Sequence, residues 1–391
     1  MLSGDRAQFA NAVVAFLFAV TGPLAIMLTV AAGAGLSEAQ TASWIFGAHF
    51  LTGLITIGFS AWHRMPLAFA WTIPGTVVVA PAFQHLSLGE IVGAYLVTGI
   101  AILALGASGL VGRIMARLPM PIVMGMVAGV FLSIGLRVVT DVPKAPAVAL
   151  VTIAAWLLLA AVPRLGNAIP PVLGALVAGI SAAAGTGTLQ GAAWPERALV
   201  QPLLIVPEFS APALLELVLP LLVTVVGIQN AQGLTVLAAA GHRPPADRVT
   251  MATGFGTLAT ALVGAVPACL TGPSNALICA SPQAERRWIG GVVYGLLMAA
   301  FGLFAPLATR LALSLPMPFI AVLGGLAMLP VLRGAFHAAF SGKHQLGALI
   351  AFMVTLANLP ILNIGAAFWA LVFGTAVSWL LERNDFARER S

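Results

Sequence analysis

Two apolar stretches of the chain are each interrupted by a proline next to a glycine. The first reads PLAFAWTIPGTVVVAPAF (66–83), broken at Pro74, and the second reads VPACLTGPSNALICA (266–280), broken at Pro273. Proline has no N–H group and a preset φ, so it suits the beginning of a helix and disrupts its interior. Each stretch is therefore expected to change from extended backbone to a short helix near its proline.

The beginning of such a short helix can bind an anion. Its first N–H groups have no partner, and the helix dipole adds about half a positive charge. Two of these N-termini facing each other would hold an anion without any arginine. We expect the first short helix at 74–84, and the extended pieces Ala68–Ile73 and Ala268–Thr271 to pair as antiparallel strands. Two ordinary proline-kinked helices are the alternative.

Small and polar residues near the two breaks are the candidate substrate ligands. Ser274 and Asn275 are natural donors to a bound anion, and Thr76 is their counterpart in the first break. Gln229 and Gln232 are three residues apart, so they share a helix face and could bind substrate oxygens or, alternatively, neighbouring helices. The candidate substrate-binding set is Thr21, Gly22, Ile73, Pro74, Gly75, Thr76, Gln229, Gln232, Thr271, Gly272, Pro273, Ser274 and Asn275.

Titratable side chains are rare at depth. Glu90, Glu208 and Glu216 lie near segment ends, and Glu216 stands about 20 Å along a helix from Gln229. His49 lies well inside an apolar segment, and a histidine side chain ordinarily titrates near neutral pH, so His49 is the candidate proton-coupling residue. A hydrogen-bonded packing role is the alternative. Because no nucleophile–base pair or metal cluster appears at depth, we expect no enzyme activity, no metal and no cofactor.

The composition is that of an integral membrane protein. Hydrophobic residues make up 60% of the 391, charged residues only 8%, and the mean hydropathy is +1.03. A soluble domain would have roughly a quarter of its residues charged. The formal net charge of +6 does not indicate nucleic-acid binding, because the cations are scattered between apolar runs. The two cysteines suggest neither a metal site nor a disulfide framework.

Fourteen apolar segments are expected, since about 20 apolar residues cross a bilayer core of about 30 Å. With a cytoplasmic N-terminus, 14 of the 18 lysines and arginines fall on the inside, as the positive-inside rule requires, and the C-terminus is cytoplasmic too. The segments are 10–33, 42–61, 66–84, 88–111, 118–136, 146–163, 168–186, 211–240, 247–266, 267–283, 288–308, 314–332, 344–359 and 361–381.

The sequence also contains an internal repeat. Leu-Pro-Met-Pro occurs at 118–121 and again at 315–318, 197 residues later, and the two proline breaks are a similar distance apart. Seven segments per half is an odd number, so the halves must be inverted in the membrane. The predicted fold is therefore an all-α polytopic membrane protein of two inverted seven-segment repeats, which is typical of secondary transporters with a site near the midplane. Thr21 and Gly22 lie at the depth equivalent to Gln229.

Several stretches resemble the bacterial benzoate:proton symporter family, in order and along essentially the full length. They are FLFAVTGPLAIML, WTIPGT, GAYLVTGI, LPMPIVMGMVAGVF and GIQNAQGLTVL. The resemblance implies the fold of the uracil:proton symporter and a place in the bacterial cytoplasmic membrane. It also implies a core domain of segments 1–4 and 8–11 and a gate domain of segments 5–7 and 12–14. These domains correspond to residues 1–116 and 211–313, and to residues 117–210 and 314–391.

The related nucleobase carriers place acidic side chains on segments eight and ten. Here Gln229 and Ser274 or Asn275 stand at about those positions, so nucleobase transport is not expected. The sequence predicts import of benzoate or a similar aromatic carboxylate with protons, by alternating access of core against gate. The alternatives are an uncoupled anion channel or exchanger of the sulfate-permease type, or a nucleobase permease. Expected partners are the anionic aromatic substrate, protons and membrane lipid, without nucleic acid; a homodimer is compatible with the sequence.

Overall fold

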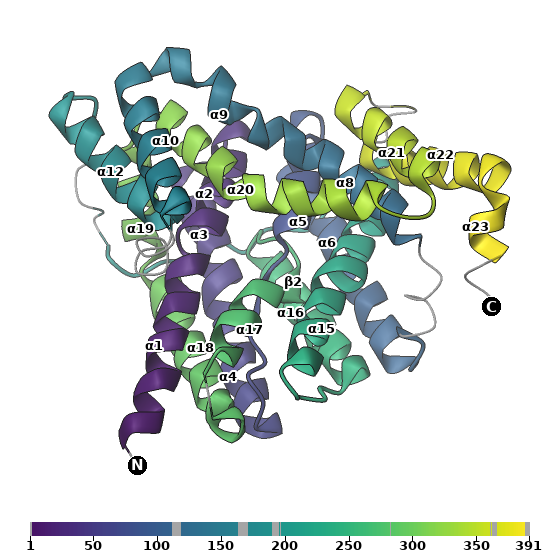
Figure 1. The fold of residues 1–391 in the computed structure, drawn as a ribbon, viewed down its shortest axis with the longest axis horizontal. Coiled ribbons are helices and arrows are strands. Elements are labelled where there is room, and N and C mark those ends of the chain that lie inside the picture. The colour runs from purple at the N-terminus through teal and green to yellow at the C-terminus, as the bar shows by residue number, and fades with distance from the viewer. Residues whose placement is uncertain are drawn as a thin grey trace. The chain divides into compact units, whose positions relative to one another are not determined.

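The computed structural model is helical apart from two short strands in the part of the chain that it describes (Figure 1). The described residues are 2–111, 119–162, 171–189, 195, 197–281, 283–359, 361 and 366–387. Leu118 of the repeated motif lies outside them. So do five arginines that count toward the predicted orientation: Arg113, Arg117, Arg164, Arg388 and Arg390.

Helices occupy all fourteen predicted segments, but fewer meet the length expected of a membrane span. Among the described residues, six are long and apolar enough, or seven if the pair Ala284–Leu303 and Ala305–Leu313, bent by 64°, forms one span. The fourteen-span count is therefore not confirmed. The six are Ala7–Gly33, Glu38–His63, Leu88–Ala107, Met120–Lys144, Ala211–Ala239 and Met317–Phe340.

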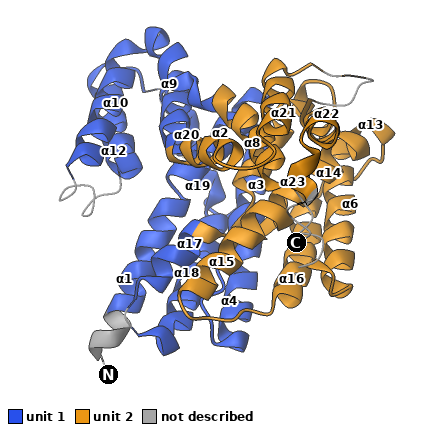
Figure 2. Cartoon of the chain, turned by 45° about the vertical axis from the view of Figure 1, so that its right-hand side comes forward, with its two compact units in different colours: residues 1–68, 134–203, 273–329 blue, residues 69–133, 204–272, 330–391 orange. Residues whose placement is uncertain are grey.

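The chain divides into two compact units, shown in blue and orange in Figure 2. Unit 1 comprises residues 1–68, 134–203 and 273–329, and unit 2 comprises residues 69–133, 204–272 and 330–391. Their boundaries recur at half-length. The division after residue 68 is matched after 272, and the division after 133 is matched after 329, which are offsets of 204 and 196. A duplicated chain would show this pattern. The units do not follow the core and gate domains, which stay a prediction.

Unit 1 is built from helices of the first, middle and later parts of the chain. They are α1 (Leu2–Ala19), α2 (Gly22–Gly33), α3 (Glu38–Phe46), the π-helical turn η1 (Gly47–Leu51), α4 (Thr52–His63), α9 (Arg137–Thr140), the 3₁₀ turn η3 (Val142–Lys144), α10 (Pro146–Ala161), α12 (Pro171–Gly185), the 3₁₀ turn η6 (Ala284–Arg286), α18 (Arg287–Leu303) and α19 (Ala305–Leu313).

Close helix packing in unit 1 depends on small residues. Helix α4 packs on α18, and α10 packs on α12. A Cβ atom built on Gly53 of α4 would lie 2.7 Å from the carbonyl oxygen of Gly295 on α18. No side chain fits there, which is how small residues let membrane helices approach closely.

Unit 2 contains both strands and the helix Ala211–Ala239, in which α-helical and π-helical stretches alternate. Its elements are β1 (Phe69–Trp71), α5 (Ile73–Val79), the 3₁₀ turn η2 (Ala82–Gln84), α6 (Leu88–Ala107), α13 (Ala211–Ala213), the π-helical turn η4 (Leu214–Val218), α14 (Leu219–Leu222), the π-helical turn η5 (Val223–Asn230), α15 (Ala231–Ala239), α16 (Ala246–Leu262), β2 (Ala268–Leu270), α21 (Gln345–Ala357), α22 (Ala366–Leu381) and α23 (Arg383–Ala387). Helices α6 and α16 pack together, as do α21 and α22.

Three helices cross the unit boundaries. They are α8 (Met120–Gly135), α17 (Gly272–Cys279) and α20 (Met317–Phe340). The predicted segment 314–332 ends earlier than α20, which continues through Pro330 to Phe340. The prediction was wrong at this end, because a proline inside a membrane helix removes only one hydrogen bond and neighbouring groups can compensate for it.

Candidate functional site

The two interrupted segments form a short antiparallel strand pair inside unit 2. Ala70 of β1 lies opposite Cys269 of β2, and the N–H of Thr72 donates to the carbonyl of Pro267 at 3.0 Å. Every strand residue is buried. Extended backbone at membrane depth is tolerated only when its polar groups are paired inside the protein. The predicted pairing of the extended pieces is confirmed.

Asn230, in the helix Ala211–Ala239, forms a hydrogen bond with the backbone of the second strand. Its Oδ1 accepts the N–H of Leu270 at 2.7 Å, and its Nδ2 donates to Oγ1 of Thr253 at 3.1 Å. Sequence reasoning left Asn230 out of the candidate site, since it points away from the face of Gln229. One sequence signal could have identified Asn230. It lies in an apolar helix in the same half of the chain as the strand Ala268–Leu270.

Asn275 has a similar structural role in unit 1. Its Oδ1 accepts the N–H of Ala68 at 3.0 Å, and its Nδ2 donates to the carbonyl of Ala68 at 3.1 Å. The amide thus pairs the backbone just before β1. Its predicted donation to a substrate stays a prediction. Its neighbour Ser274 is buried, and its hydroxyl donates to the Tyr294 hydroxyl at 3.2 Å.

The first half-helix starts one residue earlier than predicted. Helix α5 begins at Ile73, because Thr72 caps it: Thr72 Oγ1 accepts the N–H of Gly75 at 3.0 Å. The hydroxyl of Thr76 donates back to the Thr72 carbonyl at 2.8 Å. Ile73 is thus the first helical residue and not extended, and Pro74 stands second, where its missing N–H costs nothing.

The cap leaves one donor in the first turn of α5. Pro74 has no N–H, and the N–H groups of Gly75 and Thr76 both donate to Thr72. Among the described residues, only the N–H of Ile73 in this turn has no acceptor within the protein. Gly75 is needed at the cap, because a Cβ there would lie 2.3 Å from Cγ2 of Thr72.

Gln229 and Gln232 differ more than their spacing predicts. Gln229 lies in the π-helical turn η5 and is only 6% exposed, whereas Gln232 lies in α15 and is exposed. The wider π turn changes the angular relation between them, and such turns are frequent at functional sites. The Gln232 side chain lies against Gly272, where an added Cβ would be 2.6 Å from Cδ.

Gln229 is a buried amide with bonding capacity to spare. Within the described part of the chain it makes no hydrogen bond to protein. Its turn, η5, packs against α5, the helix that begins with the N–H of Ile73. The amide atoms of Gln229 are not fully buried, so a small molecule can reach them. The part of Gln229 in substrate binding stays a prediction.

The second break is shared between the units. Thr271 and Gly272 belong to unit 2, whereas Pro273, Ser274 and Asn275 belong to unit 1. Helix α17 begins at Gly272, so its start coincides with the predicted proline break. The part of these five residues in binding stays a prediction.

In unit 1, Thr21 and Gly22 mark the break between α1 and α2. The Thr21 hydroxyl donates to the Leu17 carbonyl at 2.7 Å. Thr21 also lines a cavity of about 380 Å³, whose other walls are apolar and include Leu24, Phe301, Phe304, Phe319 and Ile320. Small-molecule pockets span about 300–1,000 Å³ and are mostly apolar.

Unit 2 has an apolar cavity of its own, of about 500 Å³. Ile122 and Val123 line it, and they precede Phe319 and Ile320 of the first cavity by 197 residues each. The cavities thus occupy equivalent positions in the repeat, one in each unit.

His49 is fully buried in the π-helical turn η1 of unit 1. Its Nδ1 lies 2.9 Å from the Ile45 carbonyl, and its ring centroid lies 4.9 Å from that of Phe301. These contacts suit the packing role that the sequence left open; a proton relay at His49 stays a prediction.

Two bacterial proteins are similar to the chain over nearly its whole length. It is 29% identical to the inner membrane protein YdcO of Escherichia coli (strain K12), over 95% of this chain and 96% of the relative. It is 27% identical to a benzoate membrane transport protein of Acinetobacter baylyi, over 94% and 93% of the two chains.

Among solved structures, the chain resembles the transmembrane domain of a cyanobacterial bicarbonate transporter, BicA. The TM-score is 0.64 at 17% identity, with 96% of this chain and 98% of that chain covered. At this identity the likeness concerns the fold alone. The expected fold of the uracil:proton symporter is not supported by this match.

The family comparison agrees with the two bacterial relatives. The model of the benzoate membrane transport protein family, BenE, matches residues 5–380. The chain therefore belongs to the BenE family and is a membrane transporter, not an enzyme.

Proposed function

We propose that the protein imports benzoate or a close aromatic carboxylate together with protons, by alternating access. Family membership and the Acinetobacter relative support the substrate class. The observation that carries the proposal is Gln229, a buried amide without a protein partner in the turn that packs against α5.

The proposed binding chemistry needs no cationic side chain. The substrate carboxylate would accept the N–H of Ile73 and the side-chain amide of Gln229, next to the positive end of α5. Thr72 and Thr76 would hold that end in shape through their cap bonds.

The organisation of the fold is part of the proposal. The matched unit boundaries and matched cavities support two inverted repeats. Fourteen segments, cytoplasmic termini and a core domain moving against a gate domain complete it, as in the sequence-based prediction.

Benzoate binding to the purified protein in detergent tests the role of Gln229. A hydrogen bond to a charged group is worth about 1.5–3 kcal/mol, so Gln229→Ala should weaken binding by roughly 10- to 150-fold. Gln345→Ala, at an exposed glutamine of the same unit, should leave the Kd unchanged. Equal affinity in wild type and Gln229→Ala would remove Gln229 from the site.

An uncoupled transporter of small inorganic anions is the second candidate. The fold match to the bicarbonate transporter favours it. Competition separates the two, because bicarbonate and sulfate should not displace benzoate if an apolar wall recognises the ring. Displacement by either ion at millimolar concentration would favour the second candidate.

A further inference from the structure

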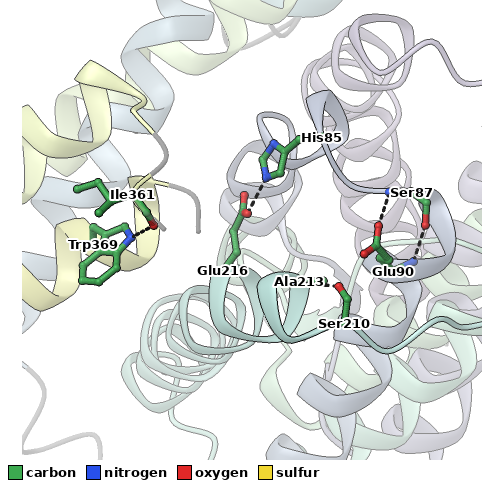
Figure 3. A network of polar contacts seen from close by, with 8 residues as sticks. All are labelled: His85, Ser87, Glu90, Ser210, Ala213, Glu216, Ile361 and Trp369. Atoms are coloured by element: carbon green, nitrogen blue, oxygen red, sulfur yellow. Dashed lines mark hydrogen bonds and ion pairs between the residues drawn. The ribbon is translucent and has the colours of Figure 1, made fainter. Parts of the chain in front are cut away.

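A histidine and a buried carboxylate form an ion-pairing contact within unit 2 (Figure 3). Nε2 of His85, just after η2, lies 2.8 Å from Oε2 of Glu216 in η4. The His85 side chain is 26% exposed and that of Glu216 only 4%. A partly exposed imidazole therefore covers a buried carboxylate.

The surroundings of this pair are acidic. Ser87 and Glu90 form a capping box at the start of α6, and the Ser87 hydroxyl donates to Glu208 at 3.0 Å. Helices α13, α14 and α22, which pack against η4, carry no charged residue in their described ranges, and α6 carries Glu90 and the phenol of Tyr95. Among the described residues around the pair, His85 is thus the one base beside three carboxylates.

The pair connects the two elements of the proposed substrate site. His85 ends the segment that runs from β1 through α5, which begins with Ile73. Glu216 belongs to the continuous helix Ala211–Ala239, which carries Gln229. A change in the charge of the pair therefore acts on both elements that the substrate would contact.

We propose, resting on the function proposed above, that the His85–Glu216 pair carries the coupled proton. With neutral His85, Nε2–H donates to the Glu216 carboxylate and the pair has a charge of −1. A proton from water then binds Nδ1 of His85, and the pair becomes an imidazolium–carboxylate of zero net charge. Uptake forms one N–H bond, at Nδ1 of His85. On the other side of the membrane this bond breaks, and the proton returns to water. Removing the negative charge weakens the repulsion of the substrate anion, a modest Coulomb effect because Gln229 lies about 20 Å along the helix from Glu216.

His85 suits this role better than His49. His49 is fully buried and packs on Phe301, whereas His85 has an exposed edge that water can protonate. In the predicted topology, the turn containing His85 also faces the outside, from which the proton would come.

Linkage gives the expected pH dependence of benzoate affinity. Because the Coulomb effect over about 20 Å is small, the Kd should rise by about fourfold in total as the pair loses its proton, and it should be constant where the pair stays protonated. Isothermal titration of the purified wild-type protein with benzoate, from about pH 6 to about pH 9, should show this change in affinity.

Two substitutions of the pair test its assignment. In His85→Gln, the side-chain amide can still donate to Glu216 but cannot titrate, so the Kd should become independent of pH. In Glu216→Gln, His85 can still take up a proton, but the pair no longer has a negative charge when His85 is neutral, so the Kd at high pH should fall toward the wild-type value at low pH. His63→Gln, at a histidine stacked on Trp62, should keep the wild-type slope. Thermal unfolding of each variant checks that it is folded. Because His85 is partly exposed and Glu216 is buried, we expect His85→Gln to destabilise the protein less than Glu216→Gln.

Each outcome decides between the proposals. A wild-type Kd that does not change with pH, or a slope that persists in folded His85→Gln, would overturn the role of the pair. If the wild type binds no benzoate at any pH, the proposed function itself is wrong, and the role of the pair falls with it.

Discussion

Two asparagines hold extended backbone in place at a depth where water is scarce. Asn230 bonds the N–H of Leu270 in unit 2, and Asn275 bonds both backbone groups of Ala68 in unit 1. An unpaired buried backbone group is expensive, and more so in a membrane. We infer that these amides stabilise the strand pair, whereas the amide of Gln229 remains available to a ligand.

Replacing Asn230 tests this structural role. Asn230→Ala should destabilise the protein by about 1–3 kcal/mol, because the N–H of Leu270 is left buried and unpaired. Thr253→Val is the matched control, since it removes one partner of Asn230 and leaves the bond to Leu270. Thermal unfolding should therefore show a larger loss for Asn230→Ala, and equal losses would contradict the assignment.

His49 is expected to pack and not to carry the proton. His49→Gln should keep the pH dependence of benzoate affinity, since its ring packs on Phe301 and lies out of reach of water. Titration of benzoate binding against pH measures this. If the Kd were independent of pH in His49→Gln but kept its wild-type pH dependence in His85→Gln, the proton-carrying residue would be His49.

At the scale of elements, glycine decides how closely helices pack. In α4, a Cβ on Gly53 would lie 2.7 Å from a backbone oxygen of α18, whereas a Cβ on Gly58 would meet nothing within 4 Å. Gly53→Ala should therefore lower the thermal unfolding midpoint. Gly58→Ala should leave it unchanged or raise it, because alanine is favoured over glycine in helices by up to about 1 kcal/mol. A reversed order would contradict the packing of α4 on α18.

The sequence predicted the elements of the site better than its contacts. A proline–glycine pair in an apolar stretch has few structural solutions, so both strand–helix breaks and their antiparallel pairing could be foreseen. The N-cap at Thr72 was not predicted. Ile73 precedes a proline, and a residue before proline prefers extended backbone, so Ile73 was expected to be extended. The π turn at Gln229 was missed too, since no residue pattern marks the extra residue in such a turn.

The role of Asn230 could not be foreseen for a different reason. Its bond to Leu270 joins residues 40 apart in sequence, and only the fold brings them together. The same holds for His85 and Glu216, which are 131 residues apart. Side-chain partners of this kind depend on tertiary contacts that local pattern does not encode.

At the scale of the whole molecule, features of both units recur about half a chain apart, as the predicted repeat would require. The unit boundaries and the two apolar cavities recur about half a chain apart, at offsets between 196 and 204 residues. This recurrence is compatible with the proposed alternating access, in which two related halves would exchange roles. Which residues contribute was not predictable from composition, since most of the chain is apolar.

Filling the cavities tests whether both belong to the transport path. Ile320→Trp in unit 1 and Val123→Trp in unit 2 should each lower the initial rate of benzoate uptake several-fold, because the larger ring fills the space that the substrate ring would use. Ile320→Val and Val123→Ile keep the apolar wall and should transport normally. Unchanged uptake in both tryptophan variants would exclude the cavities from the path.

The most direct test of the whole account is uptake of labelled benzoate into liposomes containing the purified protein, with the outside more acidic than the inside. The account predicts saturable uptake above that of protein-free liposomes, inhibited by excess unlabelled benzoate, unaffected by uracil or bicarbonate, and strongly reduced in Gln229→Ala. Uptake no faster than in protein-free liposomes, or uptake abolished by bicarbonate, would contradict it.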